Sequence, residues 1–268
     1  IEVTLHGTVD RVDTFRDGDV LYLRVIDYKT GGRKFLLGDV FDGLNMQMLV
    51  YLIALWVNGK GKYARRIAEF GDKTVENIKQ RALLTFKLTP YIGAENIGAA
   101  HIHTNVFIRG FVNRKGKYAD AVPAGILYVP ARSGGANVGR HADRDEIEAQ
   151  KLKNGRMNGI ILENESVLRG MERDAEGIFI EHSIKDGKMK GEFYTLDDME
   201  RIKKKIEKVI LDETRRMLDG DIPADYEHTC EYCEFSAVCR RESDGAKQDY
   251  VKMKHADAIK ALREEENI

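Results

Sequence analysis

Two runs of alternating apolar and polar residues, joined by an Asp-Gly turn, constrain the fold of this chain more than any other feature of its 268 residues. The runs extend from Leu5 to Phe15 and from Val20 to Lys29. Asp-Gly between such runs is a strong short-range signal for a β-hairpin, because both residues tolerate a positive φ. With Asp-Gly as the two turn residues, Arg16 pairs with Asp19, which sets the register of the hairpin.

This register gathers charged side chains on one face of the hairpin. Residues opposite each other on antiparallel strands share a face of the sheet, as do residues two apart along one strand. Asp10, Asp27 and Lys29 therefore share a face with Leu21 and Leu23, which we expect to pack as core. Asp10 and Asp27 become diagonal neighbours with Cα atoms about 7–8 Å apart, so both carboxylates can reach one hard cation.

Two interpretations explain these charges. Unpaired charges are costly to bury, so Lys29 can simply neutralise Asp27 in an ion pair at a strand end. Alternatively, the two carboxylates hold Mg²⁺ beside a lysine, an arrangement suited to phosphodiester hydrolysis. The metal then generates hydroxide, while the ammonium stabilises the charge that develops on the phosphate. Geometry leaves both open, and the chemistry favours the metal site.

The remaining pattern predicts an α/β protein. We expect helices at 43–57, 63–87, 143–154, 195–217 and 246–268, a buried strand at 125–129, and a strand or turn at 159–162. Thr195-x-x-Asp198 is a capping box that opens the long helix. His101 and His103 alternate as in a strand, and a histidine pair alone more often serves packing than metal binding. Strands that alternate with helices indicate a mixed sheet core flanked by helices.

All three cysteines of the chain lie close together near its C-terminal end. Cys230, Cys233 and Cys239 are too few for a disulfide scaffold and have the spacing of metal ligands in a reducing compartment. Zinc and iron–sulfur clusters both need four ligands as a rule. The fourth is either His228, which is awkwardly close to Cys230, or a cysteine upstream of Ile1.

Charge and composition exclude several classes of function. Lys and Arg number 43 against 44 Asp and Glu, so the net charge of −1 argues against nucleic-acid binding through bulk positive charge, although it allows a local basic channel. The basic residues between 201 and 208 are interpreted as a solvated helix face, with DNA contact as the alternative. No apolar run approaches the roughly 20 residues of a membrane span, which predicts a cytoplasmic protein without membrane contact. No phosphate-binding loop of an ATP motor is present, and Ile1 at the first position suggests a fragment of a longer chain.

Three motifs in order resemble the PD-(D/E)XK nucleases of the RecB type. They are Gly7 to Asp13 (GTVDRVD), Val25 to Gly31 (VIDYKTG) and Gln47-x-x-x-Tyr51. The resemblance implies a restriction-endonuclease-like fold and a single nuclease domain over residues 1–268, with an insertion at 58–120, a metal-cluster segment at 226–240 and a helical tail at 246–268.

The resemblance also implies roles for individual residues. Asp10, Asp27 and the backbone carbonyl of Tyr28 would bind Mg²⁺ or Mn²⁺, and Lys29 would position or activate the attacking water. Gln47 and Tyr51 would orient the site and the DNA strand; the alternative is one surface amide and one core aromatic. Arg11 and Asp13 are expected to pair with each other or with neighbours and lie outside the catalytic set.

Members of this family with a C-terminal C-x2-C-x5-C and a distant N-terminal cysteine carry a [4Fe–4S] cluster that joins the two ends of the domain. The pattern resembles the helicase–nuclease members of the family most. It implies a DNA exonuclease in double-strand break repair by homologous recombination, with a single DNA strand or duplex end and the A subunit of the helicase/nuclease as partners. The alternatives are a CRISPR-adaptation-type exonuclease, a non-catalytic DNA-end-binding module with a structural cluster, and a zinc-stabilised interaction domain.

Overall fold

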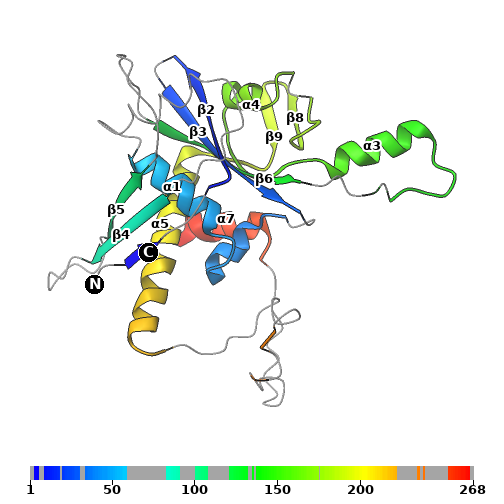
Figure 1. Cartoon of the computed structure of the whole chain (residues 1–268). Coiled ribbons are helices and arrows are strands. Elements are labelled where there is room, and N and C mark those ends of the chain that lie inside the picture. Colours follow the sequence, from blue (N-terminus) through cyan, green and yellow to red (C-terminus); the bar gives the residue numbers. More distant parts are fainter. Residues whose placement is uncertain are drawn as a thin grey trace.

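The core of the protein is a five-stranded mixed sheet, seen here in a computed structural model (Figure 1). The structure describes residues 3–5, 9–18, 20–30, 34–58, 83–90, 100–107, 121–131, 135, 137–174, 176–221, 234–235, 238 and 253–265. The strand order is β10-β7-β6-β3-β2, with β2 at Arg11–Asp17, β3 at Val20–Lys29, β6 at Ala121–Pro130, β7 at Asn158–Leu162 and β10 at Phe193–Tyr194. Strand β3 pairs antiparallel with β2 and parallel with β6, so the expected mixed α/β core is confirmed.

The register of the predicted hairpin is wrong by two residues. Asp17 pairs with Val20 and Arg16 with Leu21, so the turn lies between Asp17 and Val20 rather than at Asp-Gly. Gly18 has a φ of 58° and occupies the first turn position, where a glycine adopts the left-handed conformation without strain. A shift of two residues leaves the faces unchanged. Leu21 and Leu23 are therefore buried as predicted.

Two smaller sheets flank the core. Strands β1 (Val3–Leu5), β4 (Leu83–Pro90) and β5 (Ala100–Phe107) form one, and β8 (His182–Lys185) pairs with β9 (Lys188–Gly191) in the other. The predicted strand from Leu5 to Phe15 is thus two strands in different sheets. The helix predicted at 63–87 is wrong for its last residues, because apolar residues alternate with Thr and Lys from Leu84 to Thr89, the period of a strand. Strand β5 includes the alternating histidines.

Helices cover both faces of the central sheet. One face packs against α1 (Gln47–Asn58), α5 (Leu196–Leu218) and α7 (His255–Glu264), and the other against α4 (Glu165–Met171). Helix α1 begins at Gln47, four residues later than predicted, because Gly43 and Asn45 have positive φ values that end the preceding 3₁₀ helix η1 (Leu37–Asp42). Helix α3 (Arg144–Asn154) extends away from the sheet (Figure 1). Within the described part of the chain, no helix is long and apolar enough to cross a membrane.

Two glycines allow β6 and β7 to pair. A Cβ atom on Gly125 would lie 2.1 Å from the carbonyl oxygen of Ile160, and one on Gly159 would lie 2.0 Å from that of Ile126. Both glycines also have positive φ values, of 143° and 158°. Any side chain at either position would therefore separate the two strands.

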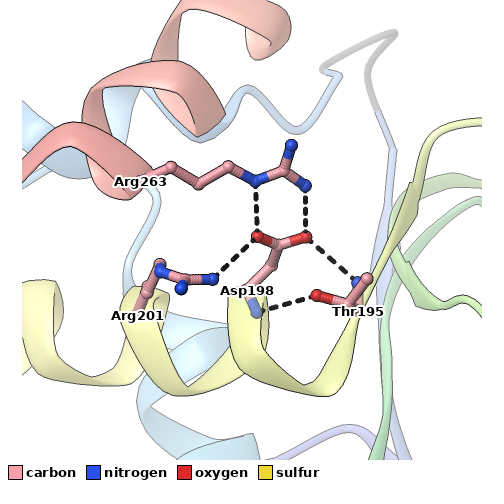
Figure 2. Close-up of polar contacts among 4 residues, drawn as sticks. All are labelled: Thr195, Asp198, Arg201 and Arg263. Carbon is pink, nitrogen blue, oxygen red and sulfur yellow. Dashed lines mark hydrogen bonds and ion pairs between the residues drawn. The ribbon is translucent and has the colours of Figure 1, made fainter. Parts of the chain in front are cut away.

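A buried carboxylate holds the C-terminal helix against α5 (Figure 2). Asp198 is 1% exposed and accepts hydrogen bonds from Nε and Nη2 of Arg263 at 2.9 and 2.7 Å. It also completes the capping box with Thr195, which confirms that prediction, and accepts from Nη1 of Arg201 at 3.4 Å. The Arg263 hydrogen bonds lower the pKa of Asp198 to about 2, although burial opposes the shift. The ion pair therefore stabilises the docking of α7 on α5.

The first residue of α7 makes a second polar connection. Nε2 of His255 lies 3.0 Å from the carbonyl oxygen of Phe35, and Nδ1 lies 2.9 Å from the hydroxyl of Tyr194. A carbonyl only accepts, so Nε2 carries a proton and donates to Phe35, while Nδ1 shares a hydrogen bond with the tyrosine hydroxyl. Helix α7 is thus tied to the segment before η1 as well as to α5.

We predict that Arg263→Gln lowers the free energy of unfolding by about 2 kcal/mol at pH 7, because the buried Asp198 loses its main partner. The pKa of Asp198 is lower in the folded state than the value of about 3.9 expected in the unfolded state. Its contribution is therefore present above pH 4 and is lost as the pH falls toward 2. Urea denaturation at pH 7 and pH 2.5 measures both effects.

Arg144→Gln is the matched control, because the side chain of Arg144 is 89% exposed in its pair with Glu148. We expect this variant to change the free energy of unfolding by less than about 0.5 kcal/mol at either pH. Equal losses in the two variants, or a loss in Arg263→Gln that persists unchanged at pH 2.5, would contradict the assigned role of Asp198.

Candidate functional site

Two predicted site residues lie at the C-terminal end of β3, on the face that α1 covers. Asp27 and Lys29 follow the buried Leu23 and Val25 at the same alternation, and their side chains are 17% and 28% exposed. Lys29 Nζ lies 2.6 Å from Oδ2 of Asp27 in an ion pair. The contact lacks hydrogen-bond geometry, so this buried oxygen receives no hydrogen bond from the residues that the structure describes. The ion pair of the simpler interpretation is therefore present, but it leaves Asp27 incompletely satisfied.

Asp10 lies beside Asp27 at the start of the hairpin. It is exposed and immediately precedes β2, and its Oδ2 accepts a hydrogen bond of 3.1 Å from the backbone N–H of Tyr28. Extending the observed register by one residue beyond the Arg11–Ile26 pair sets Asp10 directly opposite Asp27. The diagonal relation expected from the sequence is thus wrong, because the turn lies further along the chain. In the observed register the two acids are direct neighbours across the two strands and therefore lie closer together than diagonal neighbours would.

The main chain of Tyr28 faces the same side as Asp10. The carbonyl oxygen of Lys29 accepts from the N–H of Ala131, next to β6. Successive residues of a strand direct their backbone groups to opposite sides, so the backbone groups of Tyr28 point away from β6 and toward Asp10. The side chain of Tyr28 lies on the other face of the sheet, 44% exposed, where its hydroxyl accepts from Arg11 at 3.2 Å.

These oxygen donors fit a hard divalent cation. Two carboxylates and a backbone carbonyl are the ligand types that Mg²⁺ and Mn²⁺ prefer. The buried Oδ2 of Asp27 accepts no hydrogen bond from the described residues, so this oxygen can coordinate a cation without losing one. The described residues contain no group of three or more His, Cys, Asp or Glu side chains with metal-site geometry. A cation here would therefore take two side-chain ligands and complete its shell with the carbonyl, water and substrate oxygens.

Gln47 and Tyr51 lie one turn apart at the start of α1. Nε2 of Gln47 donates to the hydroxyl of Tyr51 at 3.0 Å, with the glutamine exposed and the tyrosine buried. Helix α1 packs against β3 and β6. The structure thus brings Gln47 and Tyr51 together, but in the described part of the chain neither forms a hydrogen bond with Asp10, Asp27 or Lys29.

A tyrosine that sequence reasoning did not select belongs to the site. Lys29 Nζ lies 4.8 Å from the ring centroid of Tyr128 on β6, and the Tyr128 hydroxyl donates to Oδ1 of Asn45 at 3.4 Å. The sequence places Tyr128 in a buried strand, but its position beside Asp27 depends on the parallel pairing of β3 with β6. Sequence periodicity carries no information about that pairing.

Arg11 and Asp13 form a separate network on the opposite face of the hairpin. Nε of Arg11 donates to Oδ1 of Asp13 at 2.6 Å, and Arg24 pairs with the other oxygen of Asp13. The expectation that Arg11 and Asp13 pair with each other is confirmed. The second acid of the motif is therefore paired with two partly buried arginines, whereas Asp10 lies at the site.

The predicted cluster residues Cys230, Cys233 and Cys239 lie outside the described residues, as does His228.

A hairpin at one edge of a mixed sheet brings two carboxylates and a lysine together at the strand ends, an arrangement suited to phosphodiester hydrolysis. The chain belongs to the PD-(D/E)XK nuclease superfamily, whose family model matches residues 1–240. The family resemblance of the motifs is thereby confirmed.

Curated relatives extend the comparison. The chain is 28% identical over 272 residues to the B subunit of the ATP-dependent helicase/deoxyribonuclease of Thermoanaerobacter sp. (strain X514), covering 96% of this chain and 19% of the relative. Proteins of the same name from Clostridium kluyveri (strain NBRC 12016) and Clostridioides difficile (strain 630) are 29% and 26% identical, covering 89% and 90% of this chain and 17% of each relative. The chain thus spans about a fifth of the length of the curated relatives it matches.

We predict that the two acids of the first motif differ in their contribution to stability. Asp13→Asn should lower the free energy of unfolding by about 2–3 kcal/mol, because Arg24, with 14% of its side chain exposed, loses its counter-charge. Asp10→Asn should leave stability within about 0.5 kcal/mol, since the exposed amide still accepts from Tyr28. Chemical denaturation of both variants checks this, and a larger loss in Asp10→Asn would show that Asp10 has a structural role.

Proposed function

We propose that the chain is the nuclease domain of a helicase–nuclease and that it hydrolyses phosphodiester bonds of DNA as an exonuclease. The observation that carries the proposal is the incompletely satisfied Asp27 carboxylate, which lies between Lys29 and the hairpin end that bears Asp10. Membership of a nuclease superfamily and relatives named as deoxyribonuclease subunits support it.

Each site residue has a proposed part in the reaction. Asp10, Asp27 and the carbonyl of Tyr28 hold Mg²⁺ or Mn²⁺, as is usual in this superfamily. The cation, when bound, supplies Lewis-acid stabilisation of the phosphate and lowers the pKa of a bound water. Lys29, 2.6 Å from Asp27, holds the attacking water and stabilises negative charge on the phosphoryl oxygens.

Gln47 and Tyr51 orient the site and the DNA strand in this proposal. Their hydrogen bond of 3.0 Å fixes the glutamine amide at the first turn of α1, where it remains exposed to a bound strand. Tyr51 is buried, so it acts by holding Gln47 rather than by contacting DNA.

The relatives suggest the wider setting. They are named as the B subunit of an ATP-dependent helicase/deoxyribonuclease, which favours a DNA end or single strand as substrate and the A subunit of the helicase/nuclease as partner. The ATP motor would then lie outside this chain. We place the activity in double-strand break repair by homologous recombination, in the cytoplasm.

We predict that the protein degrades end-labelled single-stranded DNA in Mg²⁺ and that Asp27→Asn lowers the rate at least about 10³-fold, because the cation loses its buried ligand. Lys29→Met should also abolish cleavage. Asp17→Asn is the control, since Asp17 is an exposed acid at the far end of the same hairpin and should be without effect. Cleavage that survives Asp27→Asn would contradict the assignment.

A protein that binds DNA ends without cutting them in Mg²⁺ or Mn²⁺ would instead indicate the non-catalytic end-binding module. Electrophoretic mobility shift of the same labelled DNA separates this outcome from a protein that binds no DNA.

We also propose that Cys230, Cys233 and Cys239 bind a [4Fe–4S] cluster with a fourth cysteine from upstream sequence. The close spacing of the three thiols supports a metal site, because paired cysteines two residues apart chelate well. The cluster would have a structural role and join the two ends of the domain.

We predict about four iron and four acid-labile sulfide atoms per chain in full-length protein purified without oxygen. Cys233→Ser should release the cluster and lower the melting temperature, because metal binding contributes directly to folding. Zinc at one atom per chain without sulfide would favour the zinc-stabilised domain, and an unchanged melting temperature in a cluster-loaded Cys233→Ser protein would contradict the structural role.

A further inference from the structure

Lys29 needs more than its ion pair to stay in place. A lysine side chain has four rotatable bonds, so ordering it costs conformational entropy. Its ammonium contacts Oδ2 of Asp27 without hydrogen-bond geometry. An additional contact therefore helps to hold Nζ at one position.

The ring of Tyr128 makes that contact. Asp27 and Tyr128 are direct partners in the parallel ladder of β3 and β6, and Lys29 follows Asp27 by two residues, so all three side chains share one face. Lys29 Nζ lies 4.8 Å from the ring centroid of Tyr128, within the range of a cation–π interaction. The ammonium of Lys29 is therefore held by two partners, the carboxylate of Asp27 and the ring of Tyr128.

Tyr128 itself is held on several sides. Its side chain is 4% exposed, and its ring packs edge-on against Phe35 with a centroid distance of 6.0 Å and an interplanar angle of 67°. Its hydroxyl donates to Asn45, whose amide in turn donates to Asp39. The ring is thus a fixed surface, unlike the flexible lysine that lies over it.

We propose that Tyr128 is a positioning residue that fixes the ammonium of Lys29 for the phosphodiester chemistry. The inference rests on the proposed function. When Asp27 also binds a cation, its charge is shared and its hold on Lys29 weakens. The attraction of the Tyr128 ring does not depend on that carboxylate, so it keeps Nζ in place through the reaction.

The first test does not depend on activity. An aromatic ring shifts the NMR signals of protons above its face upfield, so the ε-methylene protons of Lys29 should resonate upfield of those of other lysines. Selective ¹³Cε-lysine labelling of the whole chain reveals this signal, and its loss in Lys29→Arg assigns it. We expect the shift to persist in Tyr128→Phe, which keeps the ring, and to disappear in Tyr128→Leu.

Kinetics with the single-stranded DNA substrate provide the second test. Tyr128→Leu should lower kcat by about 10- to 100-fold with little change in KM, because the lysine is misplaced rather than lost. Tyr128→Phe should restore most of the rate. Denaturation curves confirm folding of each variant, and Tyr128→Met, which preserves more of the volume, replaces Tyr128→Leu if the latter does not fold.

Three results would overturn the proposal: a Lys29 signal without an upfield shift in the native chain, a shift that persists in the folded variant without a ring, or equal loss of kcat in the Phe and Leu variants. A native protein that binds but does not cleave DNA would refute the proposed nuclease. The NMR signal would still decide whether Tyr128 places Lys29.

Discussion

The ion pair between Asp27 and Lys29 determines how the rest of the site is built. Both charges lie on the face of β3 that is otherwise core, where Leu23 and Val25 are fully buried. A carboxylate on that face can be accommodated only at the strand end, because solvent, a lysine or a hard divalent cation can there replace the hydration that the carboxylate loses on burial. The pairing of β3 with β2 brings Asp10 to this end, and its pairing with β6 brings Tyr128 there.

The C-terminal helix is connected to this site through a short series of contacts. His255 of α7 donates to the carbonyl of Phe35, and the ring of Phe35 packs against Tyr128, which lies beneath Lys29. Helix α7 is fixed in turn by the ion pair of Arg263 with the buried Asp198. The helix that follows the cysteine segment in sequence therefore packs behind the residues proposed to do the chemistry.

Sequence reasoning identified the hairpin faces because the alternation of side chains survives a register error of two residues. It placed the turn at Asp17, whereas the left-handed Gly18 occupies the first turn position. It missed Tyr128, because the pairing of β3 with β6 is made between distant segments and leaves no local pattern. Apolar spacing also predicts too early a start for α1. The positive φ of Asn45 keeps the chain from being helical before Gln47, and this local backbone conformation leaves no trace in the spacing of apolar residues.

We propose above that one divalent cation binds between the two acids of the hairpin. Crystals soaked in Mn²⁺ and measured at a wavelength where manganese scatters anomalously test this directly. We expect an anomalous peak within coordination distance, about 2.2 Å, of carboxylate oxygens of Asp10 and Asp27 and of the Tyr28 carbonyl. A map without a peak there, or with the only strong peak elsewhere on the molecule, would contradict it.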